Sequence, residues 1–277
     1  MTGSLGAVRS IVIGASNPAA TIAFLRVFGF ENTATSIIIE SVASEMYGLA
    51  HETTETTLAN PSGGASLAIV ATPNAGRARS AYQLGPRALD LYTPDIESAL
   101  GLIAASGLAS SISPIGDISL GPVAMRQALI MGPDGLPVVL VQSNMARSSV
   151  LDDHPESSFS DPHSVVWCVP ERDSEAAWWQ AQFELTKGMD LGFSEPAVST
   201  YLGLPDPVVP IHMTMLSDTA IAPARLELLA FPEHPDASEA SSEDADGPLT
   251  GGIWAIRLTD QPPARTDRSP GGVRYQH

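Results

Sequence analysis

Along the first 71 residues, the spacing of hydrophobic positions is typical of a strand in some segments and of a helix in another. Residues 9–15 form a short run rich in β-branched side chains, and Asn17 stands where a helix N-cap is expected. Apolar residues then recur every three or four positions through residues 18–28, which is the spacing of one buried helix face. Two further segments that we expect to be strands, 53–59 and 65–71, flank a Pro-Ser-Gly-Gly turn. This pattern predicts a βαβββ unit.

The same order of elements recurs along the chain. Residues 88–93 are predicted to form a strand, Asp95 caps the helix that follows, and two later strands surround the Gly-Pro-Asp-Gly turn at 132–135. Residues 164–169 begin a third unit, whose helix is predicted to open at Asp173. A chain that repeats one supersecondary unit is expected to pack its copies against each other.

The repeat is visible in the letters as well as in the pattern. The segment VASEMYGL at 42–49 matches AVSTYLGL at 197–204. A fourth unit opens at residues 252–260, but only 17 residues follow it, too few for a helix and three strands. We therefore predict an α+β protein of two tandem domains with curled mixed sheets, the second of them incomplete. The predicted parts are domain 1–143, linker 144–163 and domain 164–277.

Charge and cysteine usage narrow the classes of function. The chain has 14 basic and 31 acidic residues, a net charge of −17, so we expect it to bind neither nucleic acid nor an anionic membrane. Its single cysteine, Cys168, rules out an internal disulfide framework and a Cys-rich zinc site. No apolar run reaches the roughly 20 residues of a membrane helix, and we see no leader, so the expected location is the cytoplasm.

Three segments carry a further signal. They are IVIGASNPAATIAFLRVFGFE at 11–31, the Gly-Pro-Arg-Ala-Leu-Asp segment at 85–90, and MGPDGLPVVLVQ at 131–142. These segments resemble the vicinal oxygen chelate superfamily, which contains glyoxalases, bleomycin-resistance proteins and extradiol dioxygenases. The resemblance covers residues 8–142 well, residues 164–260 less fully and the tail not at all. It implies paired βαβββ units whose sheets curl into a half-open cup around a ligand.

The resemblance also implies a divalent metal, held by His, Gln or Glu side chains on matching strands. The matching positions of the N-terminal half are Ser10, Ala68, Ala88 and Val139, and those of the C-terminal half are Ser164, Glu227 and Ile253. Only one of these residues is a carboxylate and none is an imidazole, the donors that such a site requires. We therefore expect no metal and no other cofactor. A residual site at Glu227, with His212 as a second donor, stays an alternative.

Strand alternation indicates which other side chains share the cup. If Ala88 points inward, so do Asp90 and Tyr92. A carboxyl beside a phenol in an apolar cup suits proton transfer, because burial raises the pKa of the carboxyl towards neutrality. Glu227 and His212 form the second candidate catalytic pair. The structural alternatives are a hydrogen-bonded or solvent-facing Asp90, a Glu227 paired with a nearby arginine, and a His212 that only packs in the core.

Substrate contacts are predicted from the same alternation and from the resemblance. Arg126 lies on an inner-sheet strand, where it would clamp a substrate carboxylate or balance Asp90. The full set of predicted substrate contacts is Ser10, Val12, Arg126, Val139, Ser164 and Arg257.

These observations favour a metal-independent lyase, isomerase or cyclase that acts by acid–base chemistry on a small hydrophobic organic molecule. The first alternative is a resistance-type protein that binds such a molecule without catalysis. The second is a metal-dependent glyoxalase- or dioxygenase-like enzyme with an atypical site, and the third is an inactive regulatory member. Assembly as a homodimer stays open.

Overall fold

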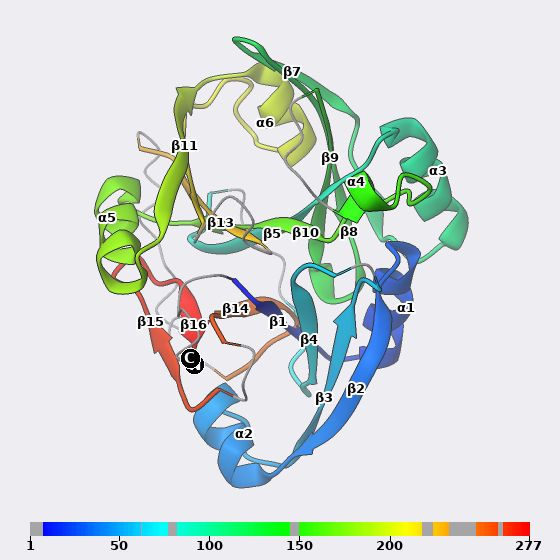
Figure 1. The fold of residues 1–277 in the computed structure, drawn as a ribbon, viewed down its shortest axis with the longest axis vertical. Helices are drawn as coiled ribbons and strands as arrows, with labels where there is room; N and C mark the ends of the chain where they lie inside the picture. The colour runs from blue at the N-terminus through cyan, green and yellow to red at the C-terminus, as the bar shows by residue number, and fades with distance from the viewer. Residues whose placement is uncertain are drawn as a thin grey trace.

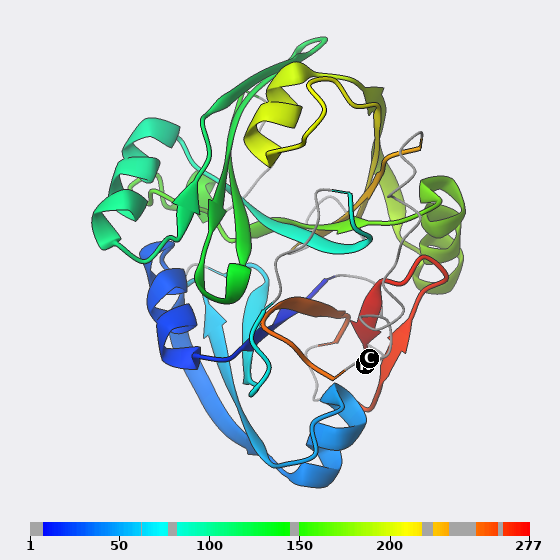
Figure 2. The ribbon, with the colours of Figure 1, turned by 180° about the vertical axis from the view of Figure 1, so that it is seen from behind.

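Two curled sheets form the framework of the protein in the computed structural model (Figure 1). The structure describes residues 8–61, 63–76, 82–144, 150–217, 224–232, 248–259 and 263–277. The two sheets lie one above the other, with helices at the flanks of the molecule and one helix, Pro196–Leu202, inside the curl of the upper sheet (Figures 1 and 2). The predicted α+β class and the curled, glyoxalase-like sheets are confirmed.

The seven-stranded sheet joins the first unit to the end of the chain. Its strands, in spatial order, are β15 (Thr266–Arg268), β16 (Arg274–Gln276), β14 (Gly252–Arg257), β1 (Ser10–Ala15), β4 (Ser66–Ala71), β3 (Thr53–Ala59) and β2 (Glu31–Ile38). β1 and β14 are antiparallel and form the seam between the two halves of this sheet. The segment predicted to open a fourth unit contributes three strands, β14, β15 and β16, with β16 parallel to β14.

The nine-stranded sheet joins the second unit to the third. Its strands run in the order β11 (Thr186–Phe193), β12 (Ile211–Ser217), β13 (Arg225–Ala230), β10 (Pro162–Cys168), β5 (Gly85–Tyr92), β9 (Pro137–Ser143), β8 (Val123–Met131) and β6 (Ser111–Ile112), and β7 (Gly116–Leu120) pairs with β8. The antiparallel pair of β5 and β10 is the seam of this sheet. Each sheet therefore takes strands from both sides of residues 144–163, and the division into domains 1–143 and 164–277 stays a prediction.

The helices begin largely where side-chain caps predict them. The helices of the described chain are α1 (Pro18–Val27), α2 (Glu40–Tyr47), α3 (Ile96–Ser106), α4 (Val150–Asp153), α5 (Arg172–Phe183) and α6 (Pro196–Leu202), with a 3-10 turn η1 (Pro133–Gly135). The side chains of Asn17 and Asp95 cap α1 and α3 as predicted. The predicted cap of α5, Asp173, is wrong: Glu171 is the N-cap residue and Asp173 lies in the first turn. β2 had no predicted element, since nearly all of its residues are exposed and no alternation marks it.

The main hydrophobic core lies between the two sheets and under the helices. Phe24 and Phe28 of α1 pack edge to face, and Phe28 meets Phe159 in the same way. Trp167 of β10 and Trp179 of α5 are among the largest fully buried side chains. In the described part of the chain, no helix is long and apolar enough to cross a membrane.

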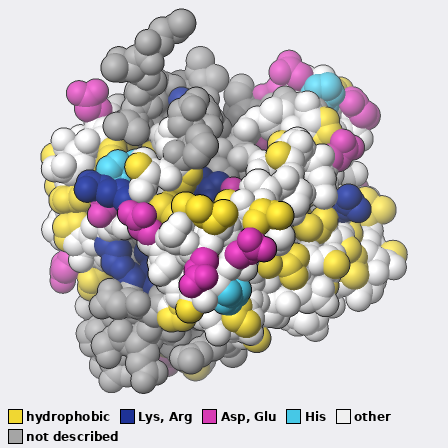
Figure 3. Space-filling model, turned by 90° about the horizontal axis from the view of Figure 1, so that it is seen from below, with side chains coloured by type: hydrophobic (Ala, Val, Ile, Leu, Met, Phe, Trp, Pro, Cys, Tyr) yellow, Lys and Arg dark blue, Asp and Glu magenta, His cyan; other side chains and the backbone are white. Residues whose placement is uncertain are grey.

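Charged side chains of both signs are scattered among hydrophobic and uncharged ones on the face at the α2 end of the molecule (Figure 3). The net charge of −17 is therefore not gathered into one acidic patch on this face.

Candidate functional site

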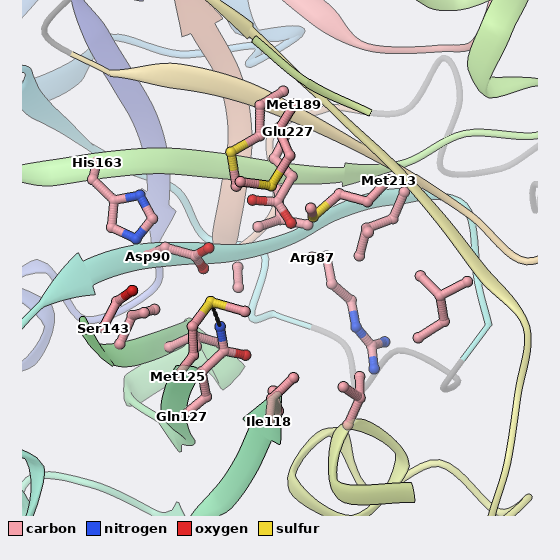
Figure 4. Close-up of a pocket in the computed structure, with 18 of the residues that line it drawn as sticks. Arg87, Asp90, Ile118, Met125, Gln127, Ser143, His163, Met189, Met213 and Glu227 are labelled. Carbon is pink, nitrogen blue, oxygen red and sulfur yellow. Dashed lines mark hydrogen bonds between the residues drawn. The ribbon is translucent and has the colours of Figure 1, made fainter. Parts of the chain in front are cut away.

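A cavity of about 170 Å³ lies between the curled strands of the nine-stranded sheet and α6. Strands β5 and β7–β13 provide its wall together with α6, so both paired units contribute (Figure 4). Most of the lining is apolar and includes four methionines, Met125, Met189, Met213 and Met215. Thioether side chains are flexible, so this wall can adapt to ligands of different shape.

Asp90 and Glu227 meet at the centre of this wall, on either side of Ser164. The Ser164 hydroxyl donates to Asp90 Oδ2 at 3.0 Å and lies 3.4 Å from Glu227 Oε2. The three residues come from β5, β10 and β13, which are neighbours in the sheet. Strand pairing places Ser164 opposite Asp90 across the β5–β10 seam, and the pairing of β10 with β13 brings Glu227 to the other side of Ser164.

Burial sets the protonation of the two carboxyl groups. Asp90 and Glu227 are 6% and 7% exposed. Burial and then the neighbouring charge of Glu227 raise the pKa of Asp90 well above its ordinary value. Burial also raises the pKa of Glu227 to about 7, against the opposing effects of the Arg225 charge and the Ser164 hydrogen bond. The pair therefore retains at least one proton near neutral pH.

A second polar cluster stands at one end of the cavity. Arg225 donates from Nη2 to Tyr92 Oη at 3.2 Å and to His163 Nδ1 at 2.7 Å. The rings of Tyr92 and His163 stack at 4.0 Å between centroids. A guanidinium group cannot accept a hydrogen bond, so His163 Nδ1 is the acceptor and is unprotonated. Tyr92 is thus held by Arg225 rather than paired with Asp90, the partner predicted for it.

Four of the predicted site residues line this cavity and one touches its carboxyl groups. Asp90, Tyr92, Glu227 and Val139 line the wall, and Ser164 bridges two of them. His212 is exposed, because the neighbouring cavity residues Ile211 and Met213 turn it to the opposite face of β12. It therefore does not meet Glu227 as predicted.

Arg126 also lies outside the cavity. Its neighbours Met125 and Gln127 face inward, so alternation turns Arg126 outward, where it pairs with Glu97 and Asp117. The clamp predicted for Arg126 is not formed by this geometry.

The remaining predicted contacts, Ser10, Val12 and Arg257, belong to the seven-stranded sheet. Val12 is buried in a core cluster, whereas Ser10 and Arg257 line a second hollow of about 390 Å³. Arg257 forms a bidentate ion pair with Glu55 at 2.6 and 2.7 Å and donates to Tyr47 at 2.6 Å. Burial would raise the pKa of Glu55, but the hydrogen bond and charge of Arg257 hold it below its ordinary value. Arg257 therefore pairs with Glu55 and not with Glu227.

Sequence reasoning did not select Arg225, His163 or the methionines of the wall. His163 stood at the end of a predicted linker, and the pairing of β10 with β5 is irregular between Pro162 and Ser164. Such a bulge interrupts the alternation of side chains, so counting residues by twos could not place His163 in the cavity. The methionines of β12 did carry a signal, since Met213 and Met215 are two residues apart in one strand.

The donors in the cavity do not fit a catalytic metal of the type the resemblance implies. Asp90 and Glu227 provide two carboxyl groups, and an apolar side chain, Val139, stands where the resemblance implies a ligand. In the ranges that the structure describes, no three His, Cys, Asp or Glu side chains converge on one point. A catalytic zinc ion is held by three protein ligands, so these residues do not make up a site of that type.

The comparisons with known proteins agree on the architecture. No protein-family model matches the sequence, and no curated protein matches it significantly. Among solved structures, glyoxalase I from Zea mays matches with a TM-score of 0.59 and 13% identity over 98% of this chain and 91% of that one. The chain has the fold of the vicinal oxygen chelate superfamily.

Two further structures with this vicinal oxygen chelate fold support that assignment. The V278E variant of the Zea mays enzyme gives a TM-score of 0.63 and 12% identity, over 98% of this chain and 91% of that one. A putative dioxygenase from Bacillus subtilis gives a TM-score of 0.62 and 12% identity, over 99% of this chain and 84% of that one. The fold predicted from the resemblance is confirmed. Identities this low show the fold alone, so the function rests on the site.

Proposed function

We propose that this protein is a metal-independent enzyme that moves a proton on a small hydrophobic organic molecule, as a lyase or isomerase does. The observation that carries the proposal is the buried pair of Asp90 and Glu227, joined by Ser164, on the wall of an apolar cavity. Two carboxyl groups that hold one proton between them provide a base and an acid at the same place.

The roles of the two groups follow from their surroundings. Glu227, with a pKa of about 7, is half ionised near neutral pH and is suited to accept a proton from the substrate. Burial and the neighbouring charge of Glu227 oppose the ionisation of Asp90, so Asp90 is suited to hold a proton. Its Oδ1 atom has no hydrogen-bond partner in the described part of the chain, so a proton on that atom is available to the substrate. The apolar wall excludes water, which would otherwise stabilise both charged forms.

Deuterium exchange tests this proposal whatever the product of the reaction is. The protein is incubated in D₂O with a panel of small hydrophobic ketones, oxo acids and esters that carry an acidic C–H, and exchange is followed by NMR. We expect catalysed exchange for at least one compound, and a loss of at least about 100-fold in Asp90→Asn and Glu227→Gln.

Asp117→Asn is the matched control, since the Asp117 side chain is 78% exposed and lies outside the cavity. Exchange that survives in both Asp90→Asn and Glu227→Gln would remove the acid–base proposal. Repeating the assay after dialysis against EDTA separates it from the metal-dependent alternative, which predicts that exchange stops.

The four methionines of the wall favour a second candidate, a protein that binds and sequesters hydrophobic molecules without changing them. This candidate predicts that members of the panel bind, that none exchanges, and that Asp90→Asn leaves their affinity unchanged.

The location and assembly also stay proposals. We propose a cytoplasmic protein that acts on small molecules, with a homodimer as the assembly to test by light scattering of the purified chain.

A further inference from the structure

Arg225 is held in a different way from three other arginines of the protein. Its half-buried guanidinium donates to the His163 carbonyl at 3.2 Å, to the His163 ring and to the Tyr92 hydroxyl. All three acceptors are uncharged. By contrast, Arg126, Arg172 and Arg257 each form an ion pair with a carboxylate.

No carboxylate oxygen of the described residues lies within 4.0 Å of the Arg225 nitrogens. Its Nη1 atom likewise has no hydrogen-bond partner there, although the side chain lines the cavity. A guanidinium that is always charged and partly desolvated is costly when no carboxylate contacts it, and an anionic ligand relieves that cost. The fork of the guanidinium matches a carboxylate, which can accept two parallel hydrogen bonds.

The carboxyl pair does not cancel this charge. Burial raises the pKa of Glu227 to about 7, so Glu227 is largely protonated below neutral pH, and burial also raises the pKa of Asp90 well above its ordinary value, which opposes its ionisation. Arg225 is then a positive charge in a cavity whose remaining wall is mostly apolar. Arg87 is the other arginine on the wall, and it lies beside α6, away from His163 (Figure 4).

We infer that Arg225 anchors a carboxylate, and that the cavity takes a small hydrophobic carboxylic acid with its apolar part against the methionines. Binding of the acid does not depend on the proposed function, and only the reaction that follows binding rests on it. Arg225 and Glu227 lie two residues apart on one face of β13, roughly 7 Å along the strand. A carboxylate on Arg225 therefore brings the carbons one or two bonds beyond it towards Glu227, the proposed base.

Calorimetric titration with matched ligands tests the anchor. At about pH 6 the wild-type protein is titrated with a series of carboxylates from pentanoate to 4-phenylbutyrate, and with the amides of the same acids. We expect at least one acid to bind at least about tenfold more tightly than its amide, because only the acid offers a charge to Arg225.

Variants then show which arginine causes the preference for the acid over its amide. Arg225→Gln is expected to bind acid and amide equally, whereas Arg87→Gln and the surface control Arg126→Gln keep the wild-type preference. Arg225→Lys keeps the charge without the planar fork and is expected to retain a reduced preference for the acid. It serves as the test if Arg225→Gln does not fold, as judged by circular dichroism.

Equal affinity of acid and amide in the wild type, no binding by any acid, or an unchanged preference in Arg225→Gln would each overturn the inference. A preference lost only in Arg87→Gln would move the anchor to the other arginine and also overturn it. Because the titration needs no turnover, it is independent of the exchange assay. If no deuterium exchange is seen, the inference that Arg225 binds a carboxylate is unaffected. If Arg225 does not bind a carboxylate, the proposed proton transfer on neutral substrates is unaffected.

Discussion

The hydroxyl oxygen of Ser164 lies 3.0 Å from Oδ2 of Asp90, across the seam where β10 meets β5. The hydroxyl carries one proton and stands between two carboxyl groups, so it can donate to only one of them at a time. The same oxygen is 3.4 Å from Glu227. Ser164 thus couples the protonation of the pair without being ionisable near neutral pH.

Ser164→Ala should raise the pKa of Glu227 further above about 7, because the Ser164 hydrogen bond favours the ionised carboxylate. The measurement is a titration of the buried carboxyl groups by infrared spectroscopy or carbon NMR. Ser10→Ala is the matched control, since Ser10 is also a buried serine on a strand but lies in the other sheet. A titration that is the same in Ser164→Ala and wild type would contradict the assigned hydrogen bond.

Glu227 should make the protein less stable as pH rises. Its folded-state pKa of about 7 exceeds the ordinary 4.5, so the folded state binds more protons between these values and stability falls across that window. Relative to wild type, Glu227→Gln should gain on the order of 3 kcal/mol in free energy of unfolding between about pH 4 and pH 8. Urea denaturation at several pH values measures this, with Asp117→Asn as the exposed control. If the difference in free energy of unfolding between Glu227→Gln and wild type does not change with pH, burial does not keep Glu227 protonated.

Arg257→Ala should destabilise the protein by about 3–5 kcal/mol, because it leaves the buried carboxylate of Glu55 without its partner. The two side chains are only 10% and 12% exposed. Arg126→Ala removes a more exposed ion pair and should cost less than about 1 kcal/mol. Chemical denaturation compares them, and the double variant Glu55→Gln/Arg257→Met should recover part of the loss. Equal costs for Arg257→Ala and Arg126→Ala would refute the buried pair.

Tyr275→Ala should cost about 3 kcal/mol, although the residue lies in the tail that carried no resemblance. Its ring packs against Trp178, Trp179 and Phe183 of α5, with centroids 5.2–5.8 Å apart. Tyr275→Phe keeps the ring and should cost under about 1 kcal/mol. Thermal unfolding distinguishes the two. If both variants melt like the wild type, the tail does not contribute to the core as the structure indicates.

Local features of the sequence determined the elements and one wall of the site. The apolar periods and the caps at Asn17 and Asp95 depend on residues within a few positions of each other, so they can be recognised in the chain alone. Alternation along one strand likewise placed Asp90 and Tyr92 on the same wall. Alternation also explains why the predicted inward placement of Arg126 and His212 does not match the structure, because it fixes which residues share a face of the strand but not which face is turned inward.

Only the tertiary structure decided which strands meet. The pairing of β5 with β10 brings Asp90 beside Ser164, 74 positions later, and the pairing of β10 with β13 adds Glu227. A strand edge can form hydrogen bonds with many partners, because its backbone groups are the same in every strand. The choice is made by burial of both sheets around one core, which depends on the whole chain. The sequence therefore placed Asp90 on one strand face with Ala88 and Tyr92, and the packing of the sheets turned that face inward and gave Asp90 a partner carboxyl group.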